Sequence, residues 1–152
     1  MSDSDSKTLE NMVRKVLTDI LAEKGSGYCR GIRHVDKSGI LSVSLPGIKP
    51  EPFNTGKPGD KVFLKDCVSL EESPRLGFGV MEMDHSRFKW TLNYDEVDYI
   101  IDGRLEILID GRSVAADKGE VIFIPKGSTI EFSAPEFVRF LYVVYPANWA
   151  EQ

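Results

Sequence analysis

The sequence predicts a single all-β domain, a sandwich or barrel, preceded by one amphipathic helix. The chain has 152 residues, which is the size of one domain. From residue 28 onward, short stretches rich in Val, Ile, Phe and Tyr alternate with Gly, Pro and Asp, as in sandwiches and barrels. Before them, an apolar stripe with helical spacing occupies the first 24 residues.

The N-terminal helix is expected over residues 8–24, followed by a flexible Gly-Ser-Gly joint at 25–27. Its apolar residues recur three and one positions apart and form one stripe: Leu9, Met12, Val13, Val16, Leu17, Ile20 and Leu21. Residues 1–27 are therefore predicted as helix and joint, and residues 28–152 as the β domain. The stripe either packs on this domain or docks in a groove on another protein, and periodicity does not separate these alternatives.

The β domain is expected to contain nine strands, at residues 39–45, 61–69, 76–83, 87–92, 96–102, 104–110, 120–124, 128–133 and 137–145. Residues 46–60 contain four prolines and three glycines and are expected to form an irregular loop. The dipeptides Asp102-Gly103 and Asp110-Gly111 favour tight turns between strands.

Composition and charge exclude several classes of protein. The net charge of -5 argues against a nucleic-acid partner and against docking on anionic membranes, since both require a basic surface. No apolar run approaches the roughly 20 residues that span a bilayer, and the polar, acidic N-terminus is not a secretory signal. The two cysteines, Cys29 and Cys67, fit a reducing compartment and have no neighbouring histidine that would support a catalytic thiolate. We therefore expect a cytoplasmic protein.

Two blocks in residues 96–127 carry a more specific pattern. In the first, Glu96 is followed by six residues and Gly103; in the second, Gly119 is followed by five residues and Pro125-Lys126-Gly127. Gly103 and Gly127 suit turns with positive φ, and Pro125 suits the end of a strand, where no ladder donor is needed. The spacing resembles the two motifs of the cupin family, which implies a small jelly-roll barrel.

The cupin metal ligands are missing, although the framework is present. The positions of the three motif histidines and the motif asparagine are occupied by Trp90, Leu92, Ile130 and Ala134. Only Glu96 remains of the usual set, and neither His34 nor His85 aligns with a ligand position. One carboxylate without imidazole does not hold a transition metal well, so we expect no such metal. A conventional metal-dependent cupin oxygenase or isomerase is accordingly disfavoured.

A closer resemblance covers residues 75–149. The blocks GFGVMEM, WTLNYDEVDYIIDG, PKGSTIEF and VRFLYVVYPANW, in this order, are similar to the C-terminal cupin domain of the EutQ family of ethanolamine utilization proteins. The resemblance implies a role in ethanolamine catabolism in a bacterial microcompartment and an acetate kinase-like activity that uses ATP and Mg²⁺. It gives helix 8–24 a possible task in docking to the microcompartment shell. By analogy with cupins, a homodimer is expected.

The candidate catalytic residues lie on the stretch from Trp90 to Asp98. If Glu96 points into the barrel, strand alternation places four more side chains inside: Trp90, Leu92, Tyr94 and Asp98. Glu96 and Asp98 would then lie roughly 6.5–7 Å apart, so that one takes a proton or a cation such as Mg²⁺ sits between them. Tyr94 could donate a hydrogen bond to a bound carboxylate or phosphate. Alternatively, Asp98 faces solvent or pairs with an arginine of the barrel, and Trp90 and Tyr94 are ordinary core residues.

Phosphoryl transfer also requires positive charge near the phosphates, and the chain has no P-loop motif. Arg87, Lys89 and Lys126 are therefore the candidate phosphate-binding residues, with Trp90 as a further candidate in substrate binding. On the strand before them, Met81 and Met83 are expected to fill the barrel, which turns Glu82 outward; the reverse would enlarge the acidic site. Two functions remain open, a kinase-like enzyme and a non-catalytic binding or assembly module.

Overall fold

The computed structural model describes residues 31–151, which fall into two units divided between Ser42 and Val43. The predicted helix 8–24, the joint at 25–27 and Cys29 lie outside the described residues. In the first unit and at its boundary, β1 (Arg33–Val35) and β2 (Leu41–Val43) pair as a two-stranded sheet. In residues 31–151, no helix is long and apolar enough to span a membrane.

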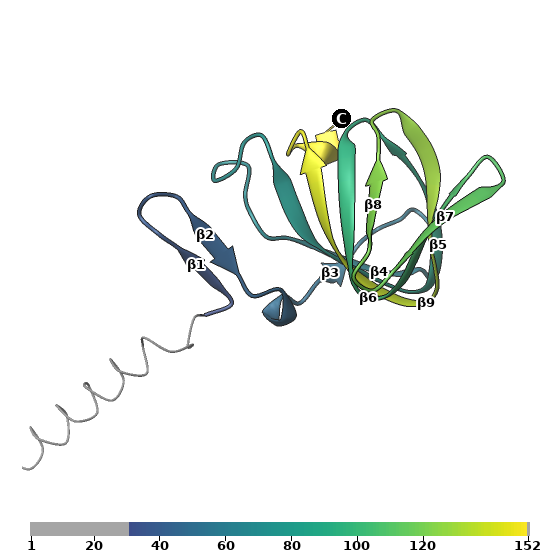
Figure 1. The fold of residues 1–152 in the computed structure, drawn as a ribbon, viewed down its shortest axis with the longest axis horizontal. Helices are drawn as coiled ribbons and strands as arrows, with labels where there is room; N and C mark the ends of the chain where they lie inside the picture. The colour runs from purple at the N-terminus through teal and green to yellow at the C-terminus, as the bar shows by residue number, and fades with distance from the viewer. Residues whose placement is uncertain (1–30, 152) are drawn as a thin grey trace, which may run out of the picture. The chain divides into compact units, whose positions relative to one another are not determined.

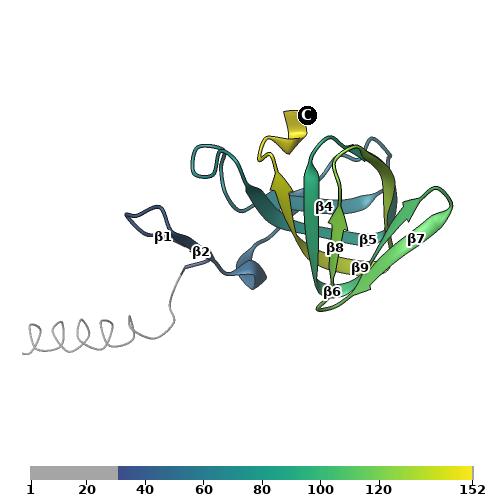
Figure 2. The same ribbon diagram turned by 45° about the horizontal axis from the view of Figure 1, so that its top comes forward.

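The second unit is a strongly curved sheet that closes around an apolar core (Figures 1 and 2). Its strands are β3 (Glu51–Pro52), β4 (Lys61–Asp66), β5 (Gly77–Leu92), β6 (Asp95–Ile109), β7 (Arg112–Asp117), β8 (Val121–Ile124) and β9 (Ser128–Tyr145). They are ordered β3-β4-β5-β9-β6-β7, and β8 pairs with β6. Two short 3₁₀ helices, η1 (Leu45–Gly47) and η2 (Trp149–Glu151), flank the sheet. The predicted all-β architecture is confirmed for these residues.

Three predicted interruptions, at 84–86, 103 and 134–136, are absent, because β5, β6 and β9 continue through them with irregular pairing. β5 bulges between Asp84 and Ser86, where His85 adopts a φ of 45°. The tight turn predicted at Asp102-Gly103 is wrong, since both residues lie inside β6 at shifts of its register with β9. Gly103 is nevertheless required there: its φ is 78°, and a Cβ would lie 2.0 Å from the Phe137 carbonyl oxygen.

Other local predictions are confirmed. Asp110 and Gly111, with φ values of 49° and 74°, form the two-residue turn between β6 and β7. Gly127 has a positive φ, and Pro125 directly follows the end of β8. Residues 46–60 are mostly irregular, as expected. The short strands β1, β3 and β7 were not among the predicted strands.

The core forms where alternate side chains of the long strands point inward. Its largest fully buried side chains are Phe140, Met83, Leu92, Ile100, Leu105, Val62, Val80, Val138, Val144 and Asp98. Met81 is buried as well, so the two methionines of β5 fill the barrel as predicted. Between them, Glu82 points outward to Arg139, whose guanidinium also donates to the Leu45 and Ile48 carbonyls at 2.7 and 2.9 Å.

The end of the barrel that carries η2 depends on a close approach between β5 and β9. The Tyr142 ring lies over Gly79, where a Cβ would be 2.1 Å from the tyrosine oxygen and 2.4 Å from the Lys65 carbonyl oxygen. The Tyr142 hydroxyl passes over this glycine and donates to Asp66 at 2.6 Å. Its ring thereby forms part of the floor of the pocket described next.

Candidate functional site: an aromatic pocket over a buried acid pair

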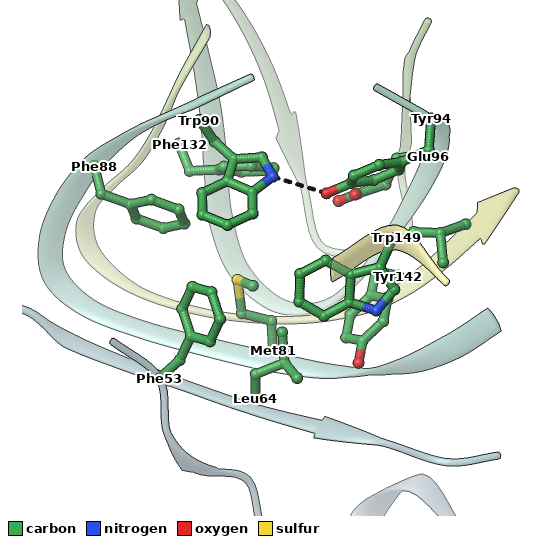
Figure 3. A pocket seen from close by; sticks show the side chains of 11 residues that line it. Phe53, Leu64, Met81, Phe88, Trp90, Tyr94, Glu96, Phe132, Tyr142 and Trp149 are labelled. Atoms are coloured by element: carbon green, nitrogen blue, oxygen red, sulfur yellow. Dashed lines mark hydrogen bonds between the residues drawn. The ribbon is translucent and has the colours of Figure 1, made fainter. Parts of the chain in front are cut away.

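A small pocket opens into the barrel interior, with a cavity of about 20 Å³. It is lined by aromatic and aliphatic side chains and one carboxyl group: Phe53, Leu64, Met81, Phe88, Trp90, Tyr94, Glu96, Phe132, Tyr142, Val144 and Trp149. Figure 3 shows the carboxyl of Glu96 beside the hydroxyl of Tyr94, with the indole of Trp90 to the left and that of Trp149 below. We call this cavity the inner pocket. About 10–15 Å³ of such space holds one water molecule, so the inner pocket takes little more than one.

Three of the rings around the inner pocket form a triangle. The ring centroids of Phe53, Trp90 and Trp149 are 5.8, 6.3 and 6.3 Å apart, with interplanar angles of 51–65°. Tilted and edge-to-face rings at these distances attract each other beyond their burial. The three residues come from the 46–60 loop, β5 and η2, so segments from both ends of the second unit build this wall.

A chain of two hydrogen bonds connects Trp90 to Glu96 through the hydroxyl group of Tyr94. The Trp90 indole Nε1 donates to the Tyr94 hydroxyl at 2.8 Å, and this hydroxyl donates to the Glu96 carboxyl. Burial and the charge of Glu96 raise the pKa of Tyr94, so the phenol keeps its proton. Tyr94 is therefore held in place by two hydrogen bonds, one accepted from Trp90 and one donated to Glu96.

Glu96 and Asp98 both point into the barrel, as strand alternation predicts. Their exposed fractions are 5% and 0%, so the alternative of a solvent-facing Asp98 is wrong. Burial raises the pKa of Glu96 to about 7, and burial together with the charge of Glu96 raises the pKa of Asp98 well above its ordinary value. Among residues 31–151, no group other than Glu96 makes a hydrogen bond with the Asp98 carboxyl. Two carboxylates cannot donate to each other, so a proton held by the pair is the available internal remedy.

The inner pocket does not fit a resident magnesium ion. Two carboxylates offer the oxygen ligands that Mg²⁺ prefers, but this ion usually keeps several waters in an octahedral shell. The inner pocket has space for little more than one water. Among residues 31–151, no group of three or more His, Cys, Asp or Glu side chains is placed to hold a metal. The expectation that Glu96 and Asp98 hold Mg²⁺ between them therefore has no support in this geometry.

Two wider hollows lie on the outer surface beside the inner pocket. The hollow lined by Lys89, Trp90, Tyr94 and Trp149 measures about 450 Å³, and its last three residues also line the inner pocket. We call it the outer hollow. A second hollow, of about 410 Å³, is lined by residues that include Lys57, Arg87 and Lys89, and we call it the basic hollow. Lys89 lines both.

The structure brings together some of the predicted site residues and not others. Trp90, Tyr94 and Glu96 line the inner pocket, with Asp98 fully buried behind it. Arg87 lines the basic hollow but is paired with the Glu131 carboxylate. Lys126 lines neither the inner pocket nor the two hollows; it is exposed on the turn after β8, where its backbone N–H donates to Asp95 at 2.8 Å. Its predicted place among the substrate-binding residues has no support in this geometry.

Sequence reasoning missed most of the aromatic wall. Phe53 lies in the Pro- and Gly-rich loop, and Trp149 follows the last strand, so neither belongs to a periodic pattern that would place it. Phe88 lies two residues before Trp90 on β5 and therefore points to the same side of the sheet. Phe132 on β9 pairs with Phe88, and their stacked rings have centroids 5.3 Å apart. Alternation along these strands was the one signal that could have found the latter two.

The barrel and its interior site define a cupin-like protein in which histidine ligands are replaced by apolar side chains and an acid pair. Fold comparison supports this class. The cupin domain of Schizosaccharomyces pombe Cnp3 matches with a TM-score of 0.57 over 72% of this chain and 77% of that one, at 17% identity. At that identity the likeness concerns the fold alone.

The chain belongs to the EutQ family. The sequence model of the family described as ethanolamine utilisation protein EutQ matches residues 4–151, so the resemblance stated from the sequence is confirmed. The protein called acetate kinase EutQ in Clostridioides difficile is 52% identical over 158 residues, covering 100% of this chain and 98% of the relative. The Salmonella typhimurium protein of the same name is 37% identical over 145 residues, and the match covers 92% of this chain but 63% of that relative.

A solved relative shows the same fold. The structure of the Clostridium difficile EutQ protein superposes with a TM-score of 0.78 at 58% identity, covering 80% of this chain and 90% of that one. The putative ethanolamine utilization protein of Salmonella typhimurium gives a TM-score of 0.72 at 40% identity, over 76% and 94% of the two chains.

Proposed function

We propose that this protein acts in ethanolamine catabolism and catalyses the reversible transfer of a phosphoryl group from ATP to acetate. The observation that carries the proposal is the 52% identity, over the whole chain, to a relative named acetate kinase. In the forward direction, an acetate oxygen attacks the γ-phosphorus of MgATP. The bond from this phosphorus to the β–γ bridging oxygen breaks, giving acetyl phosphate and ADP.

This reaction asks for positioning and positive charge rather than for a base, because acetate is already ionised at neutral pH. In our proposal, MgATP phosphates lie in the basic hollow along Lys57 and Lys89, and acetate lies in the outer hollow against Lys89 and Tyr94. Lys89 lines both hollows and would bring the two negatively charged substrates together. Both hollows are open to solvent and far larger than the inner pocket, which is too small for a nucleotide.

The side chains that separate the inner pocket from the outer hollow would be held in place by Trp90, Glu96 and Asp98. Trp90 and Tyr94 are among these side chains, and Glu96 fixes the tyrosine by accepting a hydrogen bond from its hydroxyl group. Asp98 is buried next to Glu96. If both carboxyl groups were ionised, their repulsion would raise the free energy of the folded protein, so the pair tends to keep a proton. We therefore propose Glu96 and Asp98 as residues that position Tyr94, and not as ligands of a metal.

The test traps acetyl phosphate as its hydroxamate after incubation of purified protein with acetate and MgATP. The matched variants are Glu96→Gln, which keeps the shape of the side chain, and Glu136→Gln, which removes an exposed carboxylate of β9. Displacement of a positioning group lowers kcat by one to two orders of magnitude, so Glu96→Gln should lose most of the turnover and Glu136→Gln none. Equal turnover in all three proteins would contradict the proposal and indicate a contaminating kinase.

A non-catalytic assembly module is the second candidate, and one surface feature favours it. The outer faces of β6 and β8 expose a strip of large apolar side chains, with Val97 paired to Phe123 and Tyr99 paired to Val121. Phe123 and Val121 are 61% and 58% exposed, and such strips mark sites of protein contact. This candidate predicts no acetate-dependent turnover in the wild type.

Location and partners are part of the same proposal. We propose that the protein works in the cytoplasm at a bacterial microcompartment, as a homodimer, and that helix 8–24 docks to the shell or to an enzyme partner. Deleting residues 1–24 tests this. Loss of co-purification with shell proteins at an unchanged melting temperature supports docking, whereas a large drop in melting temperature would assign the helix a structural role.

A further inference from the structure

When Glu96 is ionised, the inner pocket carries a negative charge that no basic side chain among its lining residues balances. No lysine, arginine or histidine is among its lining residues. Glu96 borders the cavity, and the fully buried Asp98 lies behind it and shares a side-chain hydrogen bond with Glu96. A buried carboxylate is costly unless it is protonated, paired or coordinated, so this site is suited to a cation that arrives from outside.

The size of the cavity restricts what that cation can be. Its volume of about 20 Å³ admits a group as large as one water molecule and excludes an ion that keeps a hydration shell. A primary ammonium group, –NH₃⁺, is of this size and brings its own three hydrogen-bond donors. Its carbon tail would not need space in the cavity, because Trp90, Tyr94 and Trp149 border both the inner pocket and the outer hollow.

The aromatic wall is complementary to the same chemical group. The rings of Phe53, Trp90 and Trp149 border the cavity and contact one another in tilted and edge-to-face pairs, with centroids 5.8–6.3 Å apart. Cation–π attraction acts when a cation lies over the face of a ring, within about 6 Å of its centroid, and ammonium groups take part in it. A ring cluster with a carboxylate at its base matches no anionic or neutral ligand equally well.

We propose that the inner pocket binds the ammonium group of a short-chain primary amine, with Glu96 as its charge partner and the rings of Phe53, Trp90 and Trp149 at its border. The tail, of one or two carbon atoms with or without a hydroxyl group, points past Trp90 and Trp149 into the outer hollow. Binding supplies donors to a carboxyl that otherwise holds a proton. This inference goes beyond the proposed kinase activity and does not depend on it.

Intrinsic fluorescence tests the proposal directly, since the chain has two tryptophans and both border the inner pocket. Full-length protein is titrated at pH 8 with methylammonium and ethanolammonium chloride, with neither acetate nor nucleotide present. We expect a saturable change in emission with both salts. Potassium chloride at equal ionic strength, the neutral diol ethylene glycol, and tetramethylammonium, which is too bulky for the cavity, should produce none.

Two variants assign the response to the site. Glu96→Gln should weaken binding at least tenfold, whereas Glu136→Gln, at an exposed position, should leave it unchanged. Trp149→Leu removes one ring of the triangle from a half-exposed position on η2 and should weaken binding several-fold, with Trp90 still reporting. Saturation by potassium or by the diol, tetramethylammonium binding as tight as methylammonium, or equal affinity in Glu96→Gln would each overturn the proposal, as would no saturation up to 100-millimolar amine.

Discussion

The buried carboxyl of Glu96 should make the stability of this protein fall as the pH rises from acid to neutral. Glu96 has an ordinary pKa of 4.5 in the unfolded chain and a pKa of about 7 in the folded one. Between these two values the folded protein holds a proton that the unfolded chain has released. The stabilisation is therefore complete below pH 4.5 and is lost as the pH passes through 7.

The size of the effect follows from this difference in pKa. Each tenfold change in proton affinity corresponds to about 1.4 kcal/mol, so Glu96 alone accounts for about 3 kcal/mol between pH 4.5 and pH 7. Because Asp98 also has a raised pKa, it adds to the decline in the same direction at higher pH. Three kilocalories is a large part of the 5–15 kcal/mol by which domains of this kind are usually stable.

Urea unfolding at a series of pH values measures this slope, with Trp90 and Trp149 as the fluorescent reporters. Wild type, Glu96→Gln and Glu136→Gln are compared, so that the titration of all other carboxyl groups is common to the three proteins. Only Glu96→Gln should lose about 3 kcal/mol of pH dependence between 4.5 and 7. A pH profile for Glu96→Gln parallel to that of the wild type would refute the reasoning and place the proton elsewhere.

Three further changes have defined outcomes. Arg139→Met should cost about 2–4 kcal/mol in urea unfolding, because Glu82 and two backbone carbonyls lose their donor; a cost below 1 kcal/mol would contradict this. Gly79→Ala should cost about 3 kcal/mol, since a Cβ would clash with Tyr142, and an unchanged melting temperature would show that the ring does not lie there. In the hydroxamate assay, Lys89→Gln should raise the KM for MgATP about tenfold and Lys126→Gln should not; equal KM values would exclude the hollows as the nucleotide site.

Strand alternation was sufficient to predict the parity of the site residues. From Trp90 to Asp98, every second side chain points inward, although Asn93 and Tyr94 connect two strands rather than continue one. The sequence signal survives this connection because the chain keeps its period across the turn. The orientation of Glu96 came from the cupin spacing, and the orientation of Asp98 followed from it.

Residue composition predicted turns at positions where the strand has an irregularity but stays in the sheet. Asp84-His85-Ser86 and Asp102-Gly103 have the composition of turns, but here they form irregularities inside β5 and β6. A bulge and a turn require the same residues, those that accept a positive φ, so composition does not distinguish them. The aromatic triangle is harder still to foresee, because Phe53 and Trp149 are 96 positions apart in the sequence and meet only in the folded barrel.

The missing histidines and the acid pair are connected by a single electrostatic argument. In a metal-binding cupin, a cation would neutralise the glutamate at the position of Glu96. Here Leu92 and Ile130, at two of the histidine positions, are 0% and 3% exposed and make the interior apolar, while Asp98 adds a second carboxyl. An interior that lacks histidine ligands for a metal must take up either a proton or a cationic ligand, since apolar walls raise the free energy of every unbalanced charge. The two options compete for the same carboxylate, so amine binding should release the proton that Glu96 holds, and its affinity should rise with pH through the region in which Glu96 ionises.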